Sequence, residues 1–322
     1  MTERTIAMAV PPPSGFSGRA LRRAERIGSA IFVGTLQGSC WFFLLLVAGL
    51  AAELVWGARL SLQKFGIGFL WSTQWNPVTE QFGAAPFIYG TVVTSLIALA
   101  LAAVIGILAA IYLAEFAPRR LGAYLGLLIE LLAAVPSIVY GLWGLFVLAP
   151  IVSNWIGPVL QDTLGFLPFF QGTIYGVNVL TAALILTLMI IPTITAITRD
   201  LIIAIPMRMR EAALALGATP WETAAKVVLP SVRRGIIGAC MLAFGRALGE
   251  TIAATMVIGN RPAISASLFA PGYTIASVIA NEFTEATSDI YLSALIELGL
   301  ILLLVSVIII GMGRLMVRLF IR

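Results

Sequence analysis

Six long apolar stretches, separated by more polar segments, dominate the pattern of this chain. They cover residues 31–57, 87–114, 122–149, 175–198, 235–259 and 289–313. A helix needs roughly 20 apolar residues to cross the core of a bilayer, and every backbone polar group inside that core must be paired within the protein. The stretches are too long and too uniformly apolar for the alternating strands of a membrane barrel. The pattern therefore predicts an all-α membrane protein with six transmembrane helices.

Positive charge is distributed unevenly between the two sides of this predicted bundle. Of the 20 lysines and arginines, Arg59, Lys64 and Arg261 lie on one side, and Arg246 lies within a stretch. The other 16 lie on the side that holds both termini. By the positive-inside rule both termini are then cytoplasmic, and the protein is expected to be a multi-pass component of a bacterial inner membrane.

The segments between the stretches define the expected organisation. We expect a cytoplasmic tail over residues 1–30, with the proline-rich first 18 residues disordered. The apolar stretch 31–57 is too long for the core of a cleavable signal peptide, so it is expected to be the first transmembrane helix. A periplasmic loop over 58–86 follows. A core with the other five transmembrane helices covers 87–318, and a cytoplasmic tail covers 319–322.

Composition narrows the function classes. Hydrophobic residues make up 60% of the chain and charged residues 11%, whereas soluble proteins carry about 25% charged residues. The net charge of +5 does not indicate a nucleic-acid partner, because the positive residues flank apolar runs. Histidine is absent, which excludes histidine-based catalysis and metal ligation. Cys40 and Cys240 lie inside apolar runs and are expected to be free thiols. The sequence therefore predicts no catalytic residue, metal site or cofactor.

The cytoplasmic segment 206–230 has the chemistry of two short helices joined by a bend. Gly217 can end the first helix in a left-handed conformation. Thr219 and Glu222 form a capping box that begins the second. We expect Pro230 to stop that helix before the next span. Local chemistry alone fits equally well a surface helix pair that only links two spans.

Two charged residues lie deep in the fifth stretch. Arg246 and Glu250 are four residues apart and are predicted to share one helical face. Charges at this depth usually face a cavity or a partner, and the arginine fork suits bidentate contact with an oxyanion. The hypothesis is that both line a substrate pathway. The alternative is a structural ion pair that fixes helix packing.

The third stretch contains a further candidate region around Pro136. Glu130 is predicted either to pair with Arg246 or to mark the same pathway, together with Ser137. Pro136 is placed to break the helix and free backbone groups that line a cavity. A simple kink without further role is the alternative.

The cytoplasmic segment also carries a family motif. Its residues match the EAA loop of ABC importer permeases at full spacing, with valine where isoleucine is usual: Glu211, Ala212, Ala213, Gly217, Val227, Leu229 and Pro230. This resemblance implies the MetI-like fold of type I importers. It also implies that the loop, with Thr219 and Glu222, docks on a cytoplasmic ATPase. Neither Lys64 nor Lys226 stands in a P-loop pattern, so ATP hydrolysis is expected on that partner and not on this chain.

Most of the chain beyond residue 60 resembles the phosphate-specific ABC transporter permeases of the PstC type. The resemblance rests on residues 69–91, 130–144, 244–260 and 267–283. The run 100–118 lacks a proline that this family often has there, which puts a local kink in doubt. The resemblance implies a channel-forming subunit for phosphate import, paired with a homologous sister permease. Two copies of an ATPase and a periplasmic phosphate-binding protein complete the implied transporter.

Three other functions remain open on the residues alone. A permease for another oxyanion, such as molybdate or sulfate, would also use Arg246. An intramembrane hydrolase would need a base other than histidine. A proton-coupled carrier using Glu130 and Glu250 would have no use for the EAA loop.

Overall fold

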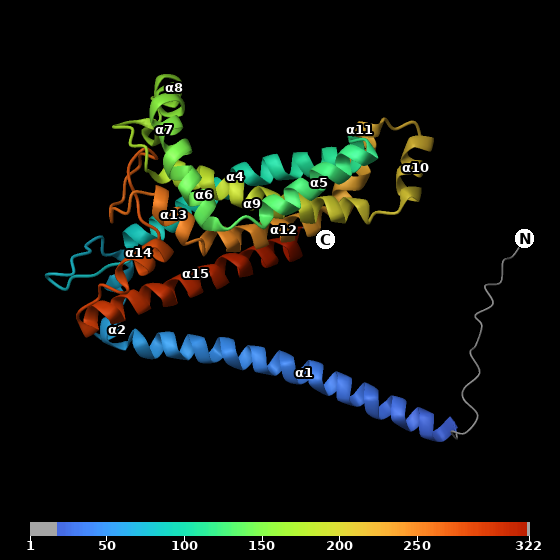
Figure 1. Cartoon of the computed structure of the whole chain (residues 1–322), viewed down its shortest axis with the longest axis horizontal. Coiled ribbons are helices and arrows are strands. Elements are labelled where there is room, and N and C mark those ends of the chain that lie inside the picture. The colour runs from blue at the N-terminus through green and yellow to red at the C-terminus, as the bar shows by residue number, and fades with distance from the viewer. Residues whose placement is uncertain (1–17, 321–322) are drawn as a thin grey trace, which may run out of the picture. The chain divides into compact units, whose positions relative to one another are not determined.

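The computed structural model describes residues 18–320, in which regular secondary structure is helical apart from one isolated β-bridge between Asn76 and Gln81 (Figure 1). The expected disorder of the first residues and the C-terminal end at 321–322 lie outside this range. The chain divides into two units, one up to Glu53 and one from Leu54 onward. The first consists of most of α1 (Gly18–Gly57), whose apolar residues from Gly28 onward are largely exposed, as lipid contact requires.

The second unit begins within the last turn of α1. Its elements in chain order are α2 (Arg59–Phe65), α3 (Gly68–Trp71), α4 (Ala85–Ile111), η1 (Tyr112–Phe116), α5 (Arg119–Ala133), α6 (Ser137–Trp143), η2 (Gly144–Leu148), α7 (Ala149–Ile151), η3 (Val152–Ile156), α8 (Gly157–Leu164), η4 (Pro168–Phe170), α9 (Val179–Ile203), α10 (Met207–Ala215), α11 (Pro220–Thr223), η5 (Ala224–Val228), α12 (Leu229–Leu248), α13 (Ile252–Val257), α14 (Ile275–Glu282) and α15 (Asp289–Phe320). Of these, η4 is a 3-10 helix, and η1, η2, η3 and η5 are π-helical turns that widen the helices containing them.

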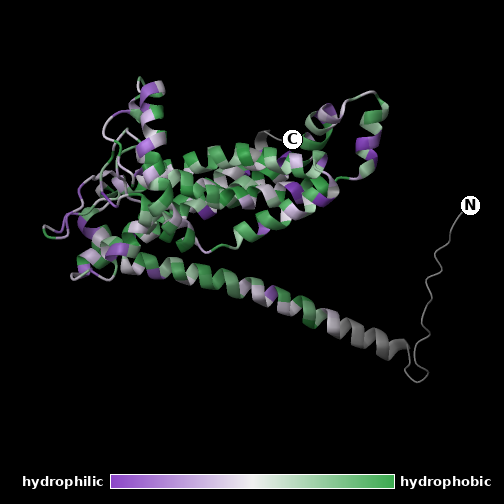
Figure 2. Ribbon diagram, turned by 45° about the horizontal axis from the view of Figure 1, so that its top comes forward, coloured by the Kyte–Doolittle hydropathy of each residue, from purple (hydrophilic) through white to green (hydrophobic). Residues whose placement is uncertain are grey.

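Six helical stretches within residues 18–320 are long and apolar enough to cross a membrane, which confirms the predicted number and the all-α class. They are Gly28–Gly57, Ala85–Phe116, Ser137–Leu164, Val179–Ile203, Pro220–Leu248 and Asp289–Leu315. Figure 2 shows apolar residues along the middle of the long helices and polar residues near their ends and in the loops.

The third stretch differs from the prediction of a helix over 122–149. Helix α5 ends at Ala133, and a separate helical run begins at Ser137 and continues to Leu164. The cause is Pro136, which lacks an N–H and disfavours helical geometry in the residue before it. The Tyr140 hydroxyl donates to the Leu132 carbonyl oxygen at 2.9 Å, close to the interruption. The hypothesis of a break at Pro136 is therefore confirmed.

Helix α9 forms the centre of the second unit and packs against α4, α5 and α12. Small residues bring these helices close together: a Cβ atom at Gly106 of α4 would lie 3.1 Å from the Ile194 side chain of α9. One buried cluster joins α4, α9 and α12 and consists of Ala98, Ala102, Leu186, Ile190, Ile194, Ala243 and Ala247. Such close contact over small side chains is what holds helices together where lipid is as apolar as the protein.

A hydrogen-bond network around Glu282 of α14 joins the segment before α4 to the start of α15. The Glu282 carboxylate accepts hydrogen bonds from Trp75 Nε1 at 2.7 Å and from the Tyr291 hydroxyl at 2.6 Å. The Tyr273 hydroxyl donates to it at 3.3 Å, and burial raises the pKa of Tyr273 to about 12, so this donor keeps its proton. Phe82 stacks on Tyr291 with ring centroids 5.2 Å apart. Trp75 is thus partly buried and held by contacts within the protein.

The orientation can be tested by cysteine labelling after Cys40 and Cys240 are replaced by serine. Thr79 and Met207 are both exposed, one in the loop before α4 and one at the start of α10. In intact cells an impermeant thiol reagent should label Thr79→Cys and not Met207→Cys, because positive charge gathers on the Met207 side. Permeabilised cells should show labelling at both positions. Labelling of Met207→Cys alone in intact cells would reverse the assignment.

Candidate functional site

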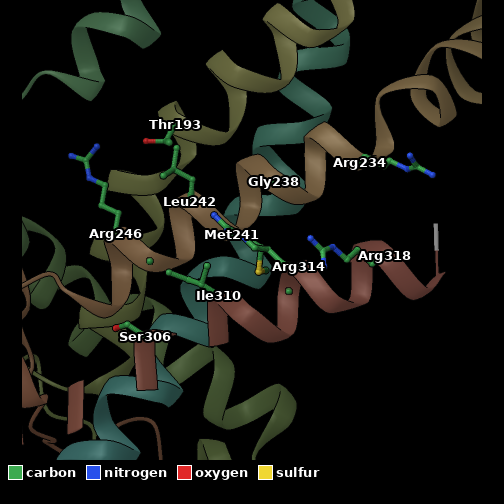
Figure 3. Close-up of a pocket in the computed structure, with 12 residues that line it drawn as sticks. Thr193, Arg234, Gly238, Met241, Leu242, Arg246, Ser306, Ile310, Arg314 and Arg318 are labelled. Atoms are coloured by element: carbon green, nitrogen blue, oxygen red, sulfur yellow. The ribbon is translucent and has the colours of Figure 1, made fainter. Parts of the chain in front are cut away.

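A groove of about 920 Å³ lies between α12 and α15, with Thr193 of α9 on its wall (Figure 3). Its lining consists of Thr193, Arg234, Gly238, Met241, Leu242, Gly245, Arg246, Ser306, Ile310, Gly313, Arg314 and Arg318. Four of these residues are arginines, and none of the described residues that line the groove is acidic. Arg234 and Arg246 are twelve positions apart on α12, which is about 18 Å along a helix. The groove is therefore an elongated, positively charged surface on the transmembrane helices.

Arg246 lies near the end of α12 and is exposed. The prediction that Glu250 shares its helical face is wrong, because α12 ends at Leu248. The Glu250 carboxylate instead accepts a hydrogen bond from the backbone N–H of Ala253 at 3.3 Å, in the first turn of α13. A side chain that caps the next helix competes with continuation of the previous one. In residues 18–320 no ion pair between Arg246 and Glu250 forms, so the alternative of a structural pair fails here.

The interruption after α12 lies where the stretches 130–144 and 244–260, both singled out in the sequence, pack against each other. Helix α13 packs against α6, and a Cβ atom at Gly141 would lie 2.6 Å from Met256 Sδ and 3.2 Å from Ala253 Cα. Ser137, the half-buried first residue of α6, directly follows the break at Pro136. The non-helical segments 134–136 and 249–251 therefore each precede a helix, α6 and α13, and these two helices pack directly on each other.

Glu130 has a different partner from the predicted one. Its carboxylate lies 3.5 Å from Arg199 Nη1 of α9, and not beside Arg246. The Arg199 guanidinium crosses α5 at Gly126, where a Cβ atom would lie 2.3 Å from Nη1. The Glu130 side chain is 58% exposed, so the pair is worth at most about 1 kcal/mol. In this structure Glu130 links α5 to α9.

The segment 206–230 has the predicted bend and capping box. Gly217 has φ of +88°, in the left-handed region, and follows α10. The Thr219 hydroxyl accepts from the Glu222 N–H at 3.2 Å, and the Glu222 carboxylate accepts from the Thr219 N–H at 3.0 Å, which completes the capping box. On α10, Glu211 and Ala212 are exposed and Ala213 is buried. The segment presents an exposed surface held by a defined bend.

Pro230 does not stop the second helix, contrary to prediction. The helical run is continuous from Pro220 through η5 and α12 to Leu248. The π-helical turn directs the Leu229 N–H to the Ala224 carbonyl oxygen, immediately before the residue that cannot donate. The Ser231 hydroxyl donates to the Val227 carbonyl oxygen at 2.6 Å. A proline in the first turn after a π-helical turn can therefore be accommodated.

One ion pair of this segment was not predicted from the sequence. Arg210 of α10 contacts Glu115 of η1 through Nη2–Oε1 at 2.7 Å and Nε–Oε1 at 3.0 Å. Both side chains are 13% exposed. The two residues are 95 positions apart, so spacing gave no sign of the contact. The available signals were an arginine directly before the EAA residues and a carboxylate just beyond the second apolar stretch.

Comparison with known proteins agrees with this architecture. Residues 102–322 match the family described as binding-protein-dependent transport system inner membrane component. The phosphate transport system permease protein PstC of Mesorhizobium japonicum is 48% identical over 97% of this chain and 96% of its own length. The PstC protein of Xylella fastidiosa is 43% identical over 98% of this chain and 97% of its own length. A probable PstC protein of Methanocaldococcus jannaschii is 37% identical over 77% of this chain and 81% of its own length.

A solved structure resembles the fold. An inward-facing form of the MetNI methionine ABC transporter contains a chain that superimposes with a TM-score of 0.53 and 17% identity. The similarity covers 72% of this chain and 93% of that chain. The predicted MetI-like permease fold is thereby confirmed.

The bend at Gly217 gives a direct test of the loop geometry. A Cβ atom there would meet nothing within 4 Å, so the cost of Gly217→Val is conformational, about 1 kcal/mol or more. The variant should insert normally, but its loop should be cut by trypsin about fivefold faster in inside-out vesicles, since cleavage follows local opening. Gly217→Asn should stay near the original rate because asparagine tolerates left-handed geometry. Equal cleavage of the valine variant would show that the bend is not needed.

Proposed function

Because the chain belongs to the family of binding-protein-dependent transport system inner membrane components, we propose that it is the permease subunit of an ATP-driven importer of inorganic phosphate. The observation that carries the substrate assignment is the 48% identity, over 97% of this chain, to a phosphate transport system permease. The arginine-lined groove between α12 and α15 supports it independently, because an oxyanion needs fixed positive donors in a poorly solvated path.

Arg246 is the residue proposed to contact phosphate during transfer. It lies in the last turn of α12, inside the apolar helical run Pro220–Leu248, where it lines the groove and is exposed. Leu242, one turn earlier on the same wall, is 61% exposed. An anion at Arg246 is therefore enclosed only when a second protein surface covers this side. A homologous sister permease would supply that surface and complete the pathway.

Glu250 and Ser137 are proposed to line the same pathway from the two interrupted segments. Glu250 lies beyond the end of α12, and Ser137 begins α6 against which α13 packs. Non-helical backbone inside a membrane protein is tolerated where it is buried in protein or lines a water-filled cavity. Glu130 has less support as a pathway residue, because its carboxylate pairs with Arg199.

The cytoplasmic loop is proposed to couple the permease to an ATPase. The exposed part of α10 with Glu211 and Ala212, the bend at Gly217 and the cap at Thr219 and Glu222 would dock on the ATPase surface. ATP binding would draw two such loops together and move the helices between inward- and outward-open states. The continuous helix from Pro220 to Leu248 connects the docking surface directly to Arg246. Both termini and this loop are proposed to be cytoplasmic.

The substrate role of Arg246 predicts that Arg246→Lys abolishes phosphate uptake in the assembled transporter. Lysine keeps the charge but loses the planar fork. Each lost charge-assisted hydrogen bond costs about 1.5–3 kcal/mol, so uptake should fall at least about tenfold. The measurement is uptake of radioactive phosphate into proteoliposomes, with basal ATPase activity and assembly expected to stay near normal.

The matched control is Arg261→Lys, the same change at an exposed arginine outside the transmembrane helices. It should leave uptake unchanged. Normal uptake by Arg246→Lys would refute the bidentate contact. Failure of both Arg246→Lys and Arg246→Ala to assemble would assign the residue to packing.

The proposed assembly contains one copy of this chain, one sister permease and two ATPase subunits, served by a periplasmic phosphate-binding protein. Its support is the arginine-lined groove, which one chain cannot enclose, and the absence of a P-loop from the sequence. Co-expression with candidate partners followed by native mass measurement should give this stoichiometry. A stable, transport-competent complex with two copies of this chain and no sister subunit would contradict it.

A further inference from the structure

Helix α10 is weakly held by apolar packing. Of its nine residues only Ala213 is buried, and non-helical turns flank it on both sides. It follows Pro206 and precedes Gly217, whose φ of +88° turns the chain. A helix between two bends, with one small buried side chain, would swing unless another contact held it. Arg210 provides that contact.

The Arg210 guanidinium joins α10 to two other elements at once. Its Nε and Nη2 atoms donate to the Glu115 carboxylate of η1, and Nη2 also donates to the Ile202 carbonyl oxygen at 2.8 Å. Nη1 donates to the Ile205 carbonyl oxygen at 2.6 Å. Ile202 is in the last turn of α9, where intrahelical partners run out and a cation is favoured, and Ile205 follows directly after the C-cap of that helix. The planar fork is therefore used on both sides, which a lysine cannot reproduce.

A second contact places η1 beside the other helix of the loop. The ring centroids of Phe116 and Trp221 lie 6.5 Å apart, and Phe116 directly follows Glu115. Beneath this region, Ile111, Ile202, Ile205 and Val228 form one buried cluster. The η1 end of the α4–η1 span is thus packed against both helices of the loop. It contacts α11 through the aromatic pair and α10 through the ion pair.

We propose that Glu115 and Arg210 are positioning residues that convert movement of the docking loop into movement of the transmembrane helices. This inference rests on the proposed function, in which the loop docks on an ATPase. The pair fixes the angle of α10 against α9 and η1, so a displacement of the loop is transmitted and not absorbed at Pro206 and Gly217. Without the pair, α10 turns between its two bends while the ATPase cycles. ATP hydrolysis then continues without matching transport.

The test uses the complete transporter, with ATPase and phosphate-binding protein, in proteoliposomes. The variants are Glu115→Gln, Arg210→Lys and the double variant Glu115→Gln/Arg210→Gln, which leaves no unpaired charge in this nearly buried site. Lys226→Gln is the control, because Lys226 forms an exposed ion pair on the same loop, 2.9 Å from Glu222. Two rates are measured on equal amounts of assembled complex: phosphate imported and ATP hydrolysed.

We expect the variants of the pair to assemble and to hydrolyse ATP near the original rate. Phosphate imported per ATP should fall about tenfold or more, since charge-assisted hydrogen bonds that fix α10 are lost. The control should keep the original ratio. A fall in both rates by the same factor would show that the pair only supports docking, and would overturn the proposal.

Two further outcomes are decisive. If the single variants do not assemble, the double variant is measured instead. The proposal is overturned if the double variant also fails to assemble, or if it imports the original amount of phosphate per ATP, because the pair then serves only stability. Unchanged ratios in assembled single variants overturn it as well. Failure of the proposed function itself is distinguishable, because the unmodified complex would then import no phosphate or retain no ATPase.

Discussion

Inside a bilayer every backbone N–H and C=O must find a partner in the protein, and this requirement governs the fold. The chain meets it with long helices, and the interruptions at 134–136 and 249–251 within predicted apolar stretches are compensated locally. Near the first, the Tyr140 hydroxyl bonds the Leu132 carbonyl oxygen. At the second, Glu250 accepts the Ala253 N–H. Because α6 packs on α13, the helices that follow these interruptions share one interior region.

Features that depend on a few neighbouring residues could be predicted from the sequence. The six apolar stretches, the left-handed glycine at 217 and the capping box at Thr219 and Glu222 all follow from local chemistry. The break at Pro136 followed too, because a missing N–H acts within one helical turn. The predicted third span nevertheless extended across this break.

Features that depend on distant contacts could not be predicted. The shared face of Arg246 and Glu250 assumed an unbroken helix, and spacing alone could not show that Glu250 caps α13. The partners of Glu130 and Glu115 lie on other helices, at Arg199 and Arg210. Pairing between such residues is set by tertiary packing, so one sequence holds no periodic signal for it.

Four ion pairs, Lys64–Glu80, Lys226–Glu222, Arg199–Glu130 and Glu115–Arg210, differ in their contribution to stability because they differ in exposure. Lys64–Glu80, Lys226–Glu222 and Arg199–Glu130 each have at least one side chain that is more than a third exposed, so water screens them. Glu115–Arg210 is largely shielded from water, and its guanidinium is also bonded to two backbone carbonyls. Of these pairs, Glu115–Arg210 is therefore the one in which water competes least with the contact between the two side chains.

The π-helical turn at Ala224–Val228 has a consequence for chain length. Such a turn contains one residue more than the α-helical path, and one residue corresponds to a rotation of about 100°. The face of α12 that lines the groove is therefore set, relative to α11, by a single extra residue. Deleting one residue from this turn would leave the arginines of the groove and the motif residues up to Gly217 unchanged, yet turn the groove residues away from α15. The orientation of the groove relative to the loop 206–230 thus depends on the number of residues between them as much as on the chemistry of those residues.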